Sequence, residues 1–395
     1  MIKKEIRKLA SDYLEEIKTI RRHLHQNPEL SCEEFKTSEF ICKKLDEYGI
    51  DYSKGIAKTG VVGLIESKNP GSANIALRSD MDALPILEEN KVDYKSVNVG
   101  KMHACGHDIH MACLLGTAKI LMKIKDQFEG SIKLIFQPSE EVYPGGAIEM
   151  IREGVLKNPD TSHVIGQHVI NTVDSGKIGI KAGPYMASTD EIFLKIKGKG
   201  GHAATPDQVI DPILIASHII VALQQIVSRN ANPITPTVIS FGRIIGDGRT
   251  NIIPDEVAVD GTLRTYDEEW RKTIHQKVAL MASGIAESMG GRCEVKISHG
   301  YPVLHNDEKL TQNIRAFATE YLGEKNVVDL EARMTAEDFA YFAREVPSCF
   351  YRLGIRNENQ GIISNLHTPT FNVDESCLET GMGLMAWLAV STLRQ

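Results

Sequence analysis

The sequence predicts an α/β fold in which a larger domain with a central, mostly parallel sheet is interrupted by an inserted ferredoxin-like α+β domain. Strand-like apolar runs alternate with helical patterns over residues 1–186, which is typical of a parallel sheet. Residues 187–298 instead follow a β-α-β-β-α-β order. The alternation of strands and helices returns in residues 299–395. A chain of 395 residues is also long for a single hydrophobic core. We therefore expect a discontinuous domain, 1–186 and 299–395, around the 187–298 insert.

The first part of the chain begins with an amphipathic helix that ends before Pro28. Buried strands and further helices then alternate. Strands are expected at 60–65, 74–78, 131–136 and 163–168, and helices at 33–48, 109–128 and 147–153. Because ligands bind beyond the carboxyl ends of parallel strands, polar residues that follow these strands are expected to converge on one crevice.

The insert contains strands and helices of a half-exposed antiparallel layer. Asp211 and Pro212 supply an N-cap and a first-turn proline for a helix that runs to about residue 229. Strands at 190–197, 237–245, 256–266 and 293–298 and a helix at 268–289 complete it. Beyond residue 301 we expect helices at 308–322, from a capping box at Thr335–Asp338, and after residue 375, with a strand at 348–353.

Composition excludes several classes of function. The formal charge of −7 argues against a nucleic-acid partner, and no basic patch for an anionic membrane is present. The longest apolar run, 382–390, is far short of the ~20 residues that span a membrane, and the N-terminus lacks a signal-peptide core. Seven scattered cysteines make a disulfide framework unlikely, so we expect a cytoplasmic protein.

Cys105 and His107 are two residues apart, separated by a glycine and directly followed by a helical pattern. A lone Cys-x-His pair is more often a buried thiol near a surface histidine. Here the chain also offers Glu141 after one predicted strand, His168 after another, and His367 in a late loop. Five such ligands exceed the three that hold one catalytic zinc, and they suit two divalent ions ~3.5–4 Å apart. A thiolate has several lone pairs, so we assign the bridge to Cys105.

Two metals beside a carboxylate that stays free to move a proton indicate a hydrolase. Glu140 is the candidate general base. Asp82 is expected to hold a ligand histidine in the right tautomer, although a turn or helix cap is an equal alternative. Asp80 is interpreted as a cap, and His103 and His110 as structural residues.

Eight short motifs carry a resemblance to a known family. They are Asp80–Pro85, Met102–Asp108, Phe136–Glu141, Gly198–Ala204, Asn251–Pro254, Gly261–Thr265, Thr335–Phe339 and Leu366–Pro369. In order and nearly over the whole chain, they resemble the amidohydrolase branch of the aminoacylase–carboxypeptidase metallopeptidases, which includes hippurate hydrolases, auxin-conjugate hydrolases and N-acetyldiaminopimelate deacetylases. The resemblance implies a dinuclear metal domain and a dimerisation domain, with the same five ligands and the same roles for Glu140 and Asp82. The broader superfamily has a histidine at Asp80, which leaves Zn, Mn, Ni or Co open.

The resemblance also implies functional residues in the insert. On sequence alone, His202 would more often be a turn residue. The resemblance places it in the partner subunit's site, where it stabilises the oxyanion, and implies a homodimer formed through the inserted domain. Asn251 and Arg264 are expected to contact the substrate, since arginine suits a bidentate carboxylate clamp.

The sequence therefore predicts a metal-dependent amidohydrolase that cleaves N-acyl amino acids, N-acetyl or N-aroyl. A dipeptidase or aminopeptidase on the same scaffold and an N-acetyldiaminopimelate deacetylase are the nearest alternatives. A thiol hydrolase with Cys105 as nucleophile would leave Glu141, His168 and His367 unexplained. A binding protein on a decayed enzyme scaffold is disfavoured by the intact Glu140.

Overall fold

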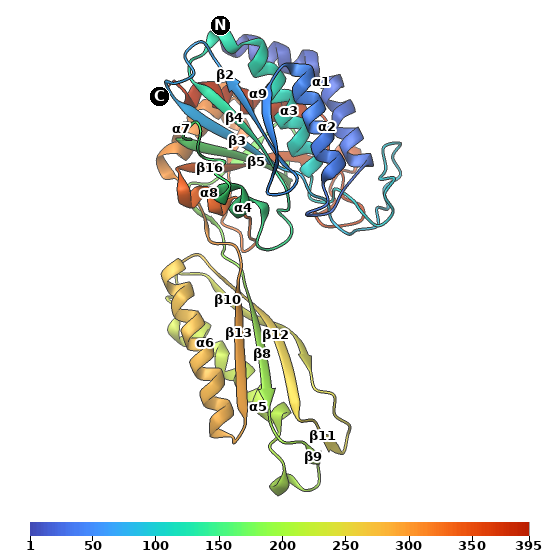
Figure 1. The fold of residues 1–395 in the computed structure, drawn as a ribbon, viewed down its shortest axis with the longest axis vertical. Coiled ribbons are helices and arrows are strands. Elements are labelled where there is room, and N and C mark those ends of the chain that lie inside the picture. Colours follow the sequence, from blue (N-terminus) through green and yellow to red (C-terminus); the bar gives the residue numbers. More distant parts are fainter. Residues whose placement is uncertain (395) are drawn as a thin grey trace. The chain divides into compact units, whose positions relative to one another are not determined.

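A computed structural model describes residues 1–394 and divides the chain into two compact units (Figure 1). Unit 1 comprises Met1–Tyr185, His305–Ala332 and the chain from Asp338 onward. Unit 2 comprises Met186–Leu304 and the short segment Arg333–Glu337. The expected insert of 187–298 lies wholly within unit 2. Short strands β7 (Gly183–Met186) and β14 (Leu304–Asn306) pair where the chain passes from one unit to the other.

Unit 1 is built on an eight-stranded sheet of order β1-β2-β4-β3-β5-β16-β6-β15. The four central strands, β4, β3, β5 and β16, run parallel to one another. On one side β2 is antiparallel to β4 and β1 to β2, and on the other β6 is antiparallel to β16 and β15 parallel to β6. The predicted α/β fold class with a central parallel sheet is thus confirmed. The strands are β1 (Asp51–Ile56), β2 (Gly60–Glu66), β3 (Asn74–Asp80), β4 (Ser131–Gln137), β5 (His163–Asp174), β6 (Ile178–Ile180), β15 (Val327–Asp329) and β16 (Ser348–Arg356).

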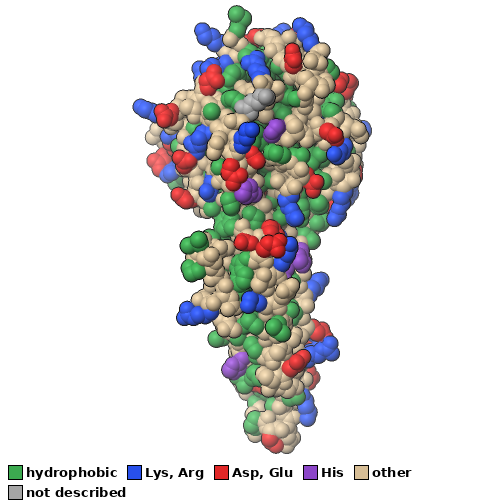
Figure 2. All heavy atoms as spheres, turned by 90° about the vertical axis from the view of Figure 1, so that its left-hand side faces the viewer, with side chains coloured by type: hydrophobic (Ala, Val, Ile, Leu, Met, Phe, Trp, Pro, Cys, Tyr) green, Lys and Arg blue, Asp and Glu red, His purple; other side chains and the backbone are tan. Residues whose placement is uncertain are grey.

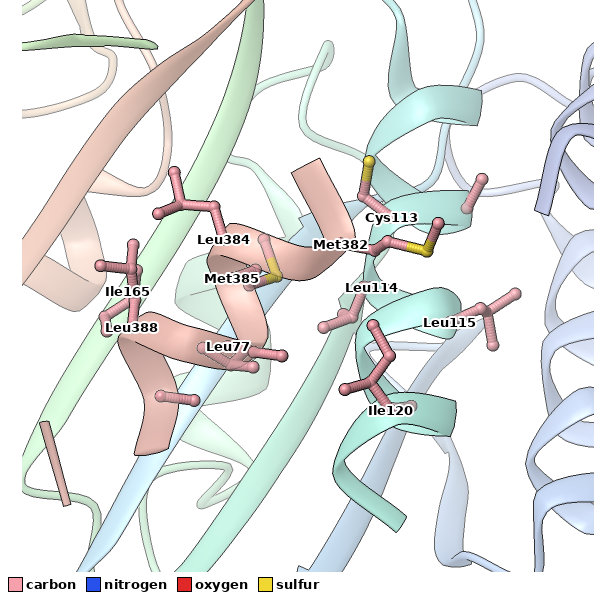
Figure 3. Packing of buried hydrophobic residues seen from close by; sticks show 14 of the residues in the cluster. Leu77, Cys113, Leu114, Leu115, Ile120, Ile165, Met382, Leu384, Met385 and Leu388 are labelled. Atoms are coloured by element: carbon pink, nitrogen blue, oxygen red, sulfur yellow. The ribbon is translucent and has the colours of Figure 1, made fainter. Parts of the chain in front are cut away.

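Helices cover this sheet, and two of them, α3 and α9, are buried on nearly all sides. The helices are α1 (Ile2–Gln26), α2 (Phe35–Tyr48), α3 (His107–Lys123), α4 (Gly146–Arg152), α7 (Glu308–Leu322), α8 (Ala340–Glu345) and α9 (Cys377–Thr392). Figure 3 shows α3 and α9 packed together over Leu77 of β3 and Ile165 of β5. A Cβ at Gly116 would lie 2.6 Å from Met382 Sδ, so glycine permits this close approach. Amphipathic α1 packs against both helices and gives α3 its burial on all faces.

Two local predictions need correction, and some strands were not predicted. β5 does not end at His168 but continues to Asp174, because β16 pairs with it as far as Arg356. No helix begins in Thr335–Asp338: α8 begins at Ala340, and the Asp338 carboxylate accepts hydrogen bonds from Ala147 N and Gln137 Nε2 instead. The polar, largely exposed strand β1 and the short strands β6 and β15 were not predicted.

Unit 2 has the predicted β-α-β-β-α-β order. Its elements are β8 (Asp190–Lys197), α5 (Pro212–Gln225), β10 (Thr237–Ile245), β12 (Glu256–Thr265), α6 (Glu268–Ser288) and β13 (Arg292–His299), with the small pair β9 (Gly201–His202) and β11 (Ile252–Ile253). The four long strands form an antiparallel sheet of order β10-β12-β8-β13. As predicted, the Asp211 side chain caps α5, accepting from the amides of Ile213 and Leu214.

Helix α5 is more apolar than a surface helix needs to be. The segment Pro212–Asn230 is long and apolar enough to cross a membrane by length and composition, but one third of its most apolar window is buried in unit 2. Its buried side packs on the sheet through residues such as Ile215, Ile219 and Leu223. Its outer side leaves Leu214 and Val221 exposed.

Candidate metal centre

The candidate site lies where the central strands of unit 1 end. Asp80 is the last residue of β3, and Glu140 and Glu141 follow β4 after a short turn. The pairing of β3 with β5 stops at Arg78 and Gly166, two residues before Asp80 and His168 respectively, so both side chains lie where the paired part of these strands has ended. Open parallel sheets bind ligands in this position.

The turn before α3 delivers two further side chains. Gly106 adopts a left-handed conformation, φ 86°, between Cys105 and His107. A Cβ there would lie 2.5 Å from Val169 Cγ2, so only glycine fits. The sharp turn lets Cys105 and the first residue of α3 enter one cluster.

The five expected metal ligands form one continuous cluster. Cys105 Sγ lies 3.4 Å from His168 Nε2 and 3.3 Å from His367 Nε2. Glu141 Oε1 lies 3.4 Å from His367 Nε2 and 3.9 Å from His107 Nε2. Residues from four separate stretches of the chain are thus brought together.

Local hydrogen bonds aim two of these histidines. His168 Nδ1 donates to Val169 O at 2.8 Å, which leaves a lone pair on the Nε2 that faces Cys105. His367 has a left-handed backbone, φ 61°, and its amide donates to Ala104 O at 2.8 Å. This conformation is uncommon outside glycine, and such strain concentrates at functional sites.

The cluster has the unmet polar groups that a divalent cation would satisfy. His107 Nε2 and Glu141 Oε1 are buried and find no hydrogen-bond partner within residues 1–394, while His107 Nδ1 lies 3.4 Å from Asp82 Oδ1. Although burial acts the other way, the carboxylates of Asp80, Asp82 and Glu141 raise the pKa of His107 to about 10. A surplus of buried negative charge with sulfur, nitrogen and oxygen donors fits borderline-soft divalent metals.

Asp82 acts both as a cap and as a neighbour of His107. Its Oδ1 accepts from Glu140 N and its Oδ2 from Glu141 N, each at 3.0 Å. Ser31 Oγ donates to Oδ2 at 2.6 Å, and His107 Nδ1 lies 3.4 Å from Oδ1. Against the effect of burial, these contacts lower the pKa of the carboxyl. One buried aspartate therefore orients His107 and the backbone of both glutamates.

The interpretation of Asp80 as a cap is wrong. Its carboxylate is buried, accepts from His110 Nδ1 at 2.5 Å and from Arg78 Nη1 at 2.8 Å, and lies 3.7 Å from His107 Nε2. His110 Nε2 in turn accepts from Val169 N at 2.8 Å. His110, expected to be structural, thus belongs to the same histidine–aspartate group as His107.

Sequence reasoning missed a second set of buried charges, which lies around the first turn of α3 next to the candidate metal cluster. Arg21 Nε and His25 Nδ1, both on α1, each lie 2.8 Å from Asp108 Oδ2. His25 Nε2 lies 3.1 Å from Glu88 Oε1. Asp108 directly follows His107, so this network holds the start of α3. The available signal was that Arg21 and His25, one helical turn apart, fall among the apolar positions of an amphipathic helix.

The remaining expected site residues belong to unit 2. His202 is exposed on β9, which pairs with β11, and Ala203 N donates to Asn251 O at 3.0 Å. Arg264 is half-buried near the far end of β12. Ile252, which pairs with His202, lies four residues before Glu256, the first residue of β12. Arg264 lies eight residues beyond Glu256, about 26 Å at the usual strand rise. Unit 2 therefore brings His202 and Asn251 together but keeps Arg264 apart from them.

A buried thiol–imidazole–carboxylate cluster at the strand ends of an α/β unit is typical of the class of metal-assisted hydrolases. The family model of peptidase family M20/M25/M40 matches residues 76–390, and the chain belongs to this family. It is therefore a hydrolase.

Named relatives support the same assignment. The chain is 42% identical to N-acetyl-L-cysteine deacetylase of Bacillus subtilis, over 91% of this chain and 84% of that protein. It is 43% identical to N-acyl-L-amino acid amidohydrolase of Geobacillus stearothermophilus, over 78% and 83%. The crystal structure of the YXEP protein of Bacillus subtilis, described as a dinuclear metal binding peptidase, matches with a TM-score of 0.85 and 33% identity, over 98% and 99%.

Proposed function

We propose that this protein is a metal-dependent amidohydrolase that cleaves the amide of N-acyl amino acids, N-acetyl or N-aroyl, into a carboxylate and a free amino acid. The observation that carries the proposal is the cluster of Cys105, His107, Glu141, His168 and His367, in which Cys105, His107 and His168 are buried, Glu141 is half-buried and His367 is exposed. The names of the two enzymes reported above support the substrate class, since both act on N-acylated amino acids.

Two divalent ions, Zn, Mn, Ni or Co, would be held by the five cluster residues, with the Cys105 thiolate between them. When bound, such ions polarise the substrate carbonyl and lower the pKa of water in the site. The orphaned atoms of His107 and Glu141 and the surplus of carboxylates support this proposal.

Glu140 would serve as the general base. Its side chain is 7% exposed, and a carboxylate oxygen lies in one group with ligand atoms of His107 and Glu141. Asp82 holds the amide of Glu140, so the carboxylate starts from a fixed backbone. Glu140 would take a proton from the attacking water and return it to the leaving amide nitrogen.

A thiol hydrolase that uses Cys105 as nucleophile is disfavoured by electrostatics. Burial, together with the carboxylates of Glu141, Glu140 and Asp80, raises the pKa of the Cys105 thiol. A catalytic thiol needs the opposite shift, because the thiolate is the nucleophile. Bound cations would reverse the balance, which again favours a ligand role.

We also propose a homodimer formed through unit 2. Leu214 and Val221 of α5 and Ile244 of β10 are exposed apolar side chains. β10 is an edge strand, whose free backbone groups can pair with a second copy. His202 pairs with Ile252, which precedes the start of β12, and Arg264 lies about 26 Å further along that strand, more than the length of an N-acyl amino acid. One substrate that contacts both would therefore draw on two copies of the chain.

The sharpest test starts from protein stripped of metal with a chelator and reloaded with Zn, Mn, Ni or Co. We expect reloading to restore hydrolysis of N-acetyl and N-aroyl amino acids, including N-acetyldiaminopimelate as one member of the panel. Dipeptides and aminopeptidase substrates serve as the comparison. A preference for dipeptides would favour the peptidase alternative, which the description of the YXEP protein supports. Turnover that is indifferent to chelators would overturn the metal-dependent proposal.

The state of the cysteines indicates the cellular compartment in which the enzyme works. The seven cysteines are all free thiols, and five of them besides Cys105 are buried. We propose that the enzyme works in the reducing cytoplasm.

A further inference from the structure

The segment between α1 and α2 contacts the turn that follows β3, which contains Asp82, and the turn that follows β4, which contains Ser139. Ser31 Oγ donates to Asp82 Oδ2 at 2.6 Å. The next residue, Cys32, donates its amide to Ser139 Oγ at 2.8 Å. Glu34 then contacts Ser139 directly. Ser139 immediately precedes Glu140. This segment is therefore placed to fix the backbone position from which the side chain of Glu140, the proposed base, projects.

Ser139 has a backbone conformation that needs support. Its φ of 56° is left-handed, which residues other than glycine rarely adopt. Asp82 holds the two amides that follow, those of Glu140 and Glu141. If Ser139 relaxed to a negative φ, the chain would leave Gln137-Pro138 in another direction and move both carboxylates.

Glu34 supplies that support with a fully buried carboxylate. Its Oε1 accepts from Ser139 N at 2.8 Å and from Ser139 Oγ at 3.2 Å. Its Oε2 accepts from Thr59 Oγ1 at 2.8 Å, which anchors the other end of the group. Glu34 is 0% exposed, so water does not compete for these bonds. Hydrogen bonds to a carboxylate are stronger than neutral ones.

We propose that Glu34 is a positioning residue for Glu140: it holds Ser139 in the left-handed conformation that aims the base at the metal cluster. The part of this inference that is tested by kcat rests on the proposed function. The part that is tested by the backbone conformation of Ser139 does not. Glu34 touches neither substrate nor metal in this role and acts only through the Ser139 backbone.

The test compares Glu34→Ala with a matched control. Glu29 accepts, through Oε2, hydrogen bonds from the backbone N and the hydroxyl of Thr37, the same pattern in the same segment but away from Ser139. We expect Glu34→Ala to lower kcat about 10- to 100-fold with KM changed less than about 3-fold, because small displacements of a catalytic group cost this much. Glu34→Gln, which keeps the acceptor for Ser139, should recover most of kcat. Glu29→Ala should leave kcat within about 2-fold.

A second substitution separates positioning from loss of stability. Glycine adopts a positive φ without cost, so Ser139→Gly added to Glu34→Ala should raise kcat again at least several-fold. The Cys32 amide loses its partner in that variant, but Cys32 is exposed and water can replace it. Should Glu34→Ala not fold, Glu34→Asp, which keeps the charge but is too short to join Ser139 and Thr59, takes its place in the same comparison.

Crystal structures of the variants provide a readout that does not depend on turnover. The expected result is a negative φ at Ser139 in Glu34→Ala and a positive φ at residue 139 in the double variant. An unchanged kcat with an unchanged Ser139 in Glu34→Ala would overturn the inference while the proposed function stands. If the wild-type enzyme hydrolysed no N-acyl amino acid, the proposed function would fail, and the Ser139 conformation alone would decide the role of Glu34.

Discussion

Two adjacent glutamates can take different parts because one aspartate holds both of their amides. Asp82 accepts from Glu140 N through one oxygen and from Glu141 N through the other. Consecutive side chains on such a fixed backbone point in different directions. In the proposed mechanism, Glu141 would then serve the metal cluster and Glu140 the attacking water.

Replacing Glu140 by Gln should lower kcat by about 10²–10⁴-fold, the usual contribution of a general base. Metal content, measured by elemental analysis, should stay at the wild-type value because Glu140 is not one of the five proposed ligands. Glu149→Gln changes an exposed acid on α4 and is the control, expected to be neutral in both measurements. A Glu140→Gln enzyme with near-normal turnover would remove the residue from the mechanism.

Replacing Cys105 by Ala tests the proposed bridge. The thiol lies within 3.4 Å of ligand atoms of both His168 and His367, so its loss should weaken the site they share. We expect bound metal to fall below two ions per chain in elemental analysis after dialysis. Cys113→Ala, on the buried face of α3, serves as the matched control. Retention of two tightly bound ions by Cys105→Ala would contradict a bridging thiolate.

At the scale of elements, buried charges join helices and strands at defined points. Arg21 and His25 tie α1 to Asp108 at the start of α3, and Arg271 of α6 binds Asp190 at the start of β8. Breaking such a pair is costly, because the remaining charge stays buried without compensation. These contacts set where each element begins relative to its neighbour.

Asp190 gives unit 2 a stability that depends on pH. Although burial acts the other way, hydrogen bonds from Arg271 and His275 hold the pKa of Asp190 well below its ordinary value. Below about pH 4 the unfolded chain binds this proton and the folded chain does not, so stability falls as the pH falls. The contribution is fully present above about pH 5.

Asp190→Asn should therefore lower the free energy of unfolding most at pH 7, and its difference from wild type should shrink toward pH 3. Chemical denaturation of both proteins between pH 3 and pH 7 measures this. Asp260→Asn, which removes an exposed partner of Arg243, is the control and should cost less than about 1 kcal/mol. A difference between Asp190→Asn and wild type that is constant across the range would exclude the ionised carboxylate as its cause.

At the scale of the whole molecule, charged side chains of both signs are dispersed over the surface. Figure 2 shows acidic and basic side chains intermingled on the face in view, consistent with a formal charge of −7 and no basic patch there. The exposed apolar side chains of α5 and β10 are instead what a dimer of unit 2 would cover.

Complementation tests that dimer and the role of His202 together. His202→Ala and Glu140→Gln should each be nearly inactive alone. When they are co-expressed, a mixed dimer restores one site that has Glu140 from one copy and His202 from the other, so about a quarter of wild-type activity is expected. Glu140→Gln with Cys105→Ala should show no recovery, since both lesions lie in unit 1. Absence of recovery in the first pair would confine His202 to its own chain.

The residues that we propose to hold metal were found from sequence because their signals are local. Cys105 and His107 flank a glycine before a helix, and Glu141 and His168 belong to short motifs on predicted strands. The role of Asp80 could not be read in this way, because its partners His110 and Arg78 are set by the packing of α3 on β3. The capping box at Thr335–Asp338 failed for a related reason: Asp338 is used by Ala147 and Gln137.

The sequence by itself determined the α/β class, the order of the main elements of unit 2 and the residue types that can hold metal, since periodicity, caps and short motifs act over a few neighbouring residues. Only the tertiary structure decided which buried charges meet. Arg21 with Asp108 and Glu34 with Ser139 are 87 and 105 residues apart. Contacts at that separation depend on how whole elements pack. A buried charge must be hydrogen-bonded to a group that packing places beside it, and nearby residues in the sequence do not identify that group.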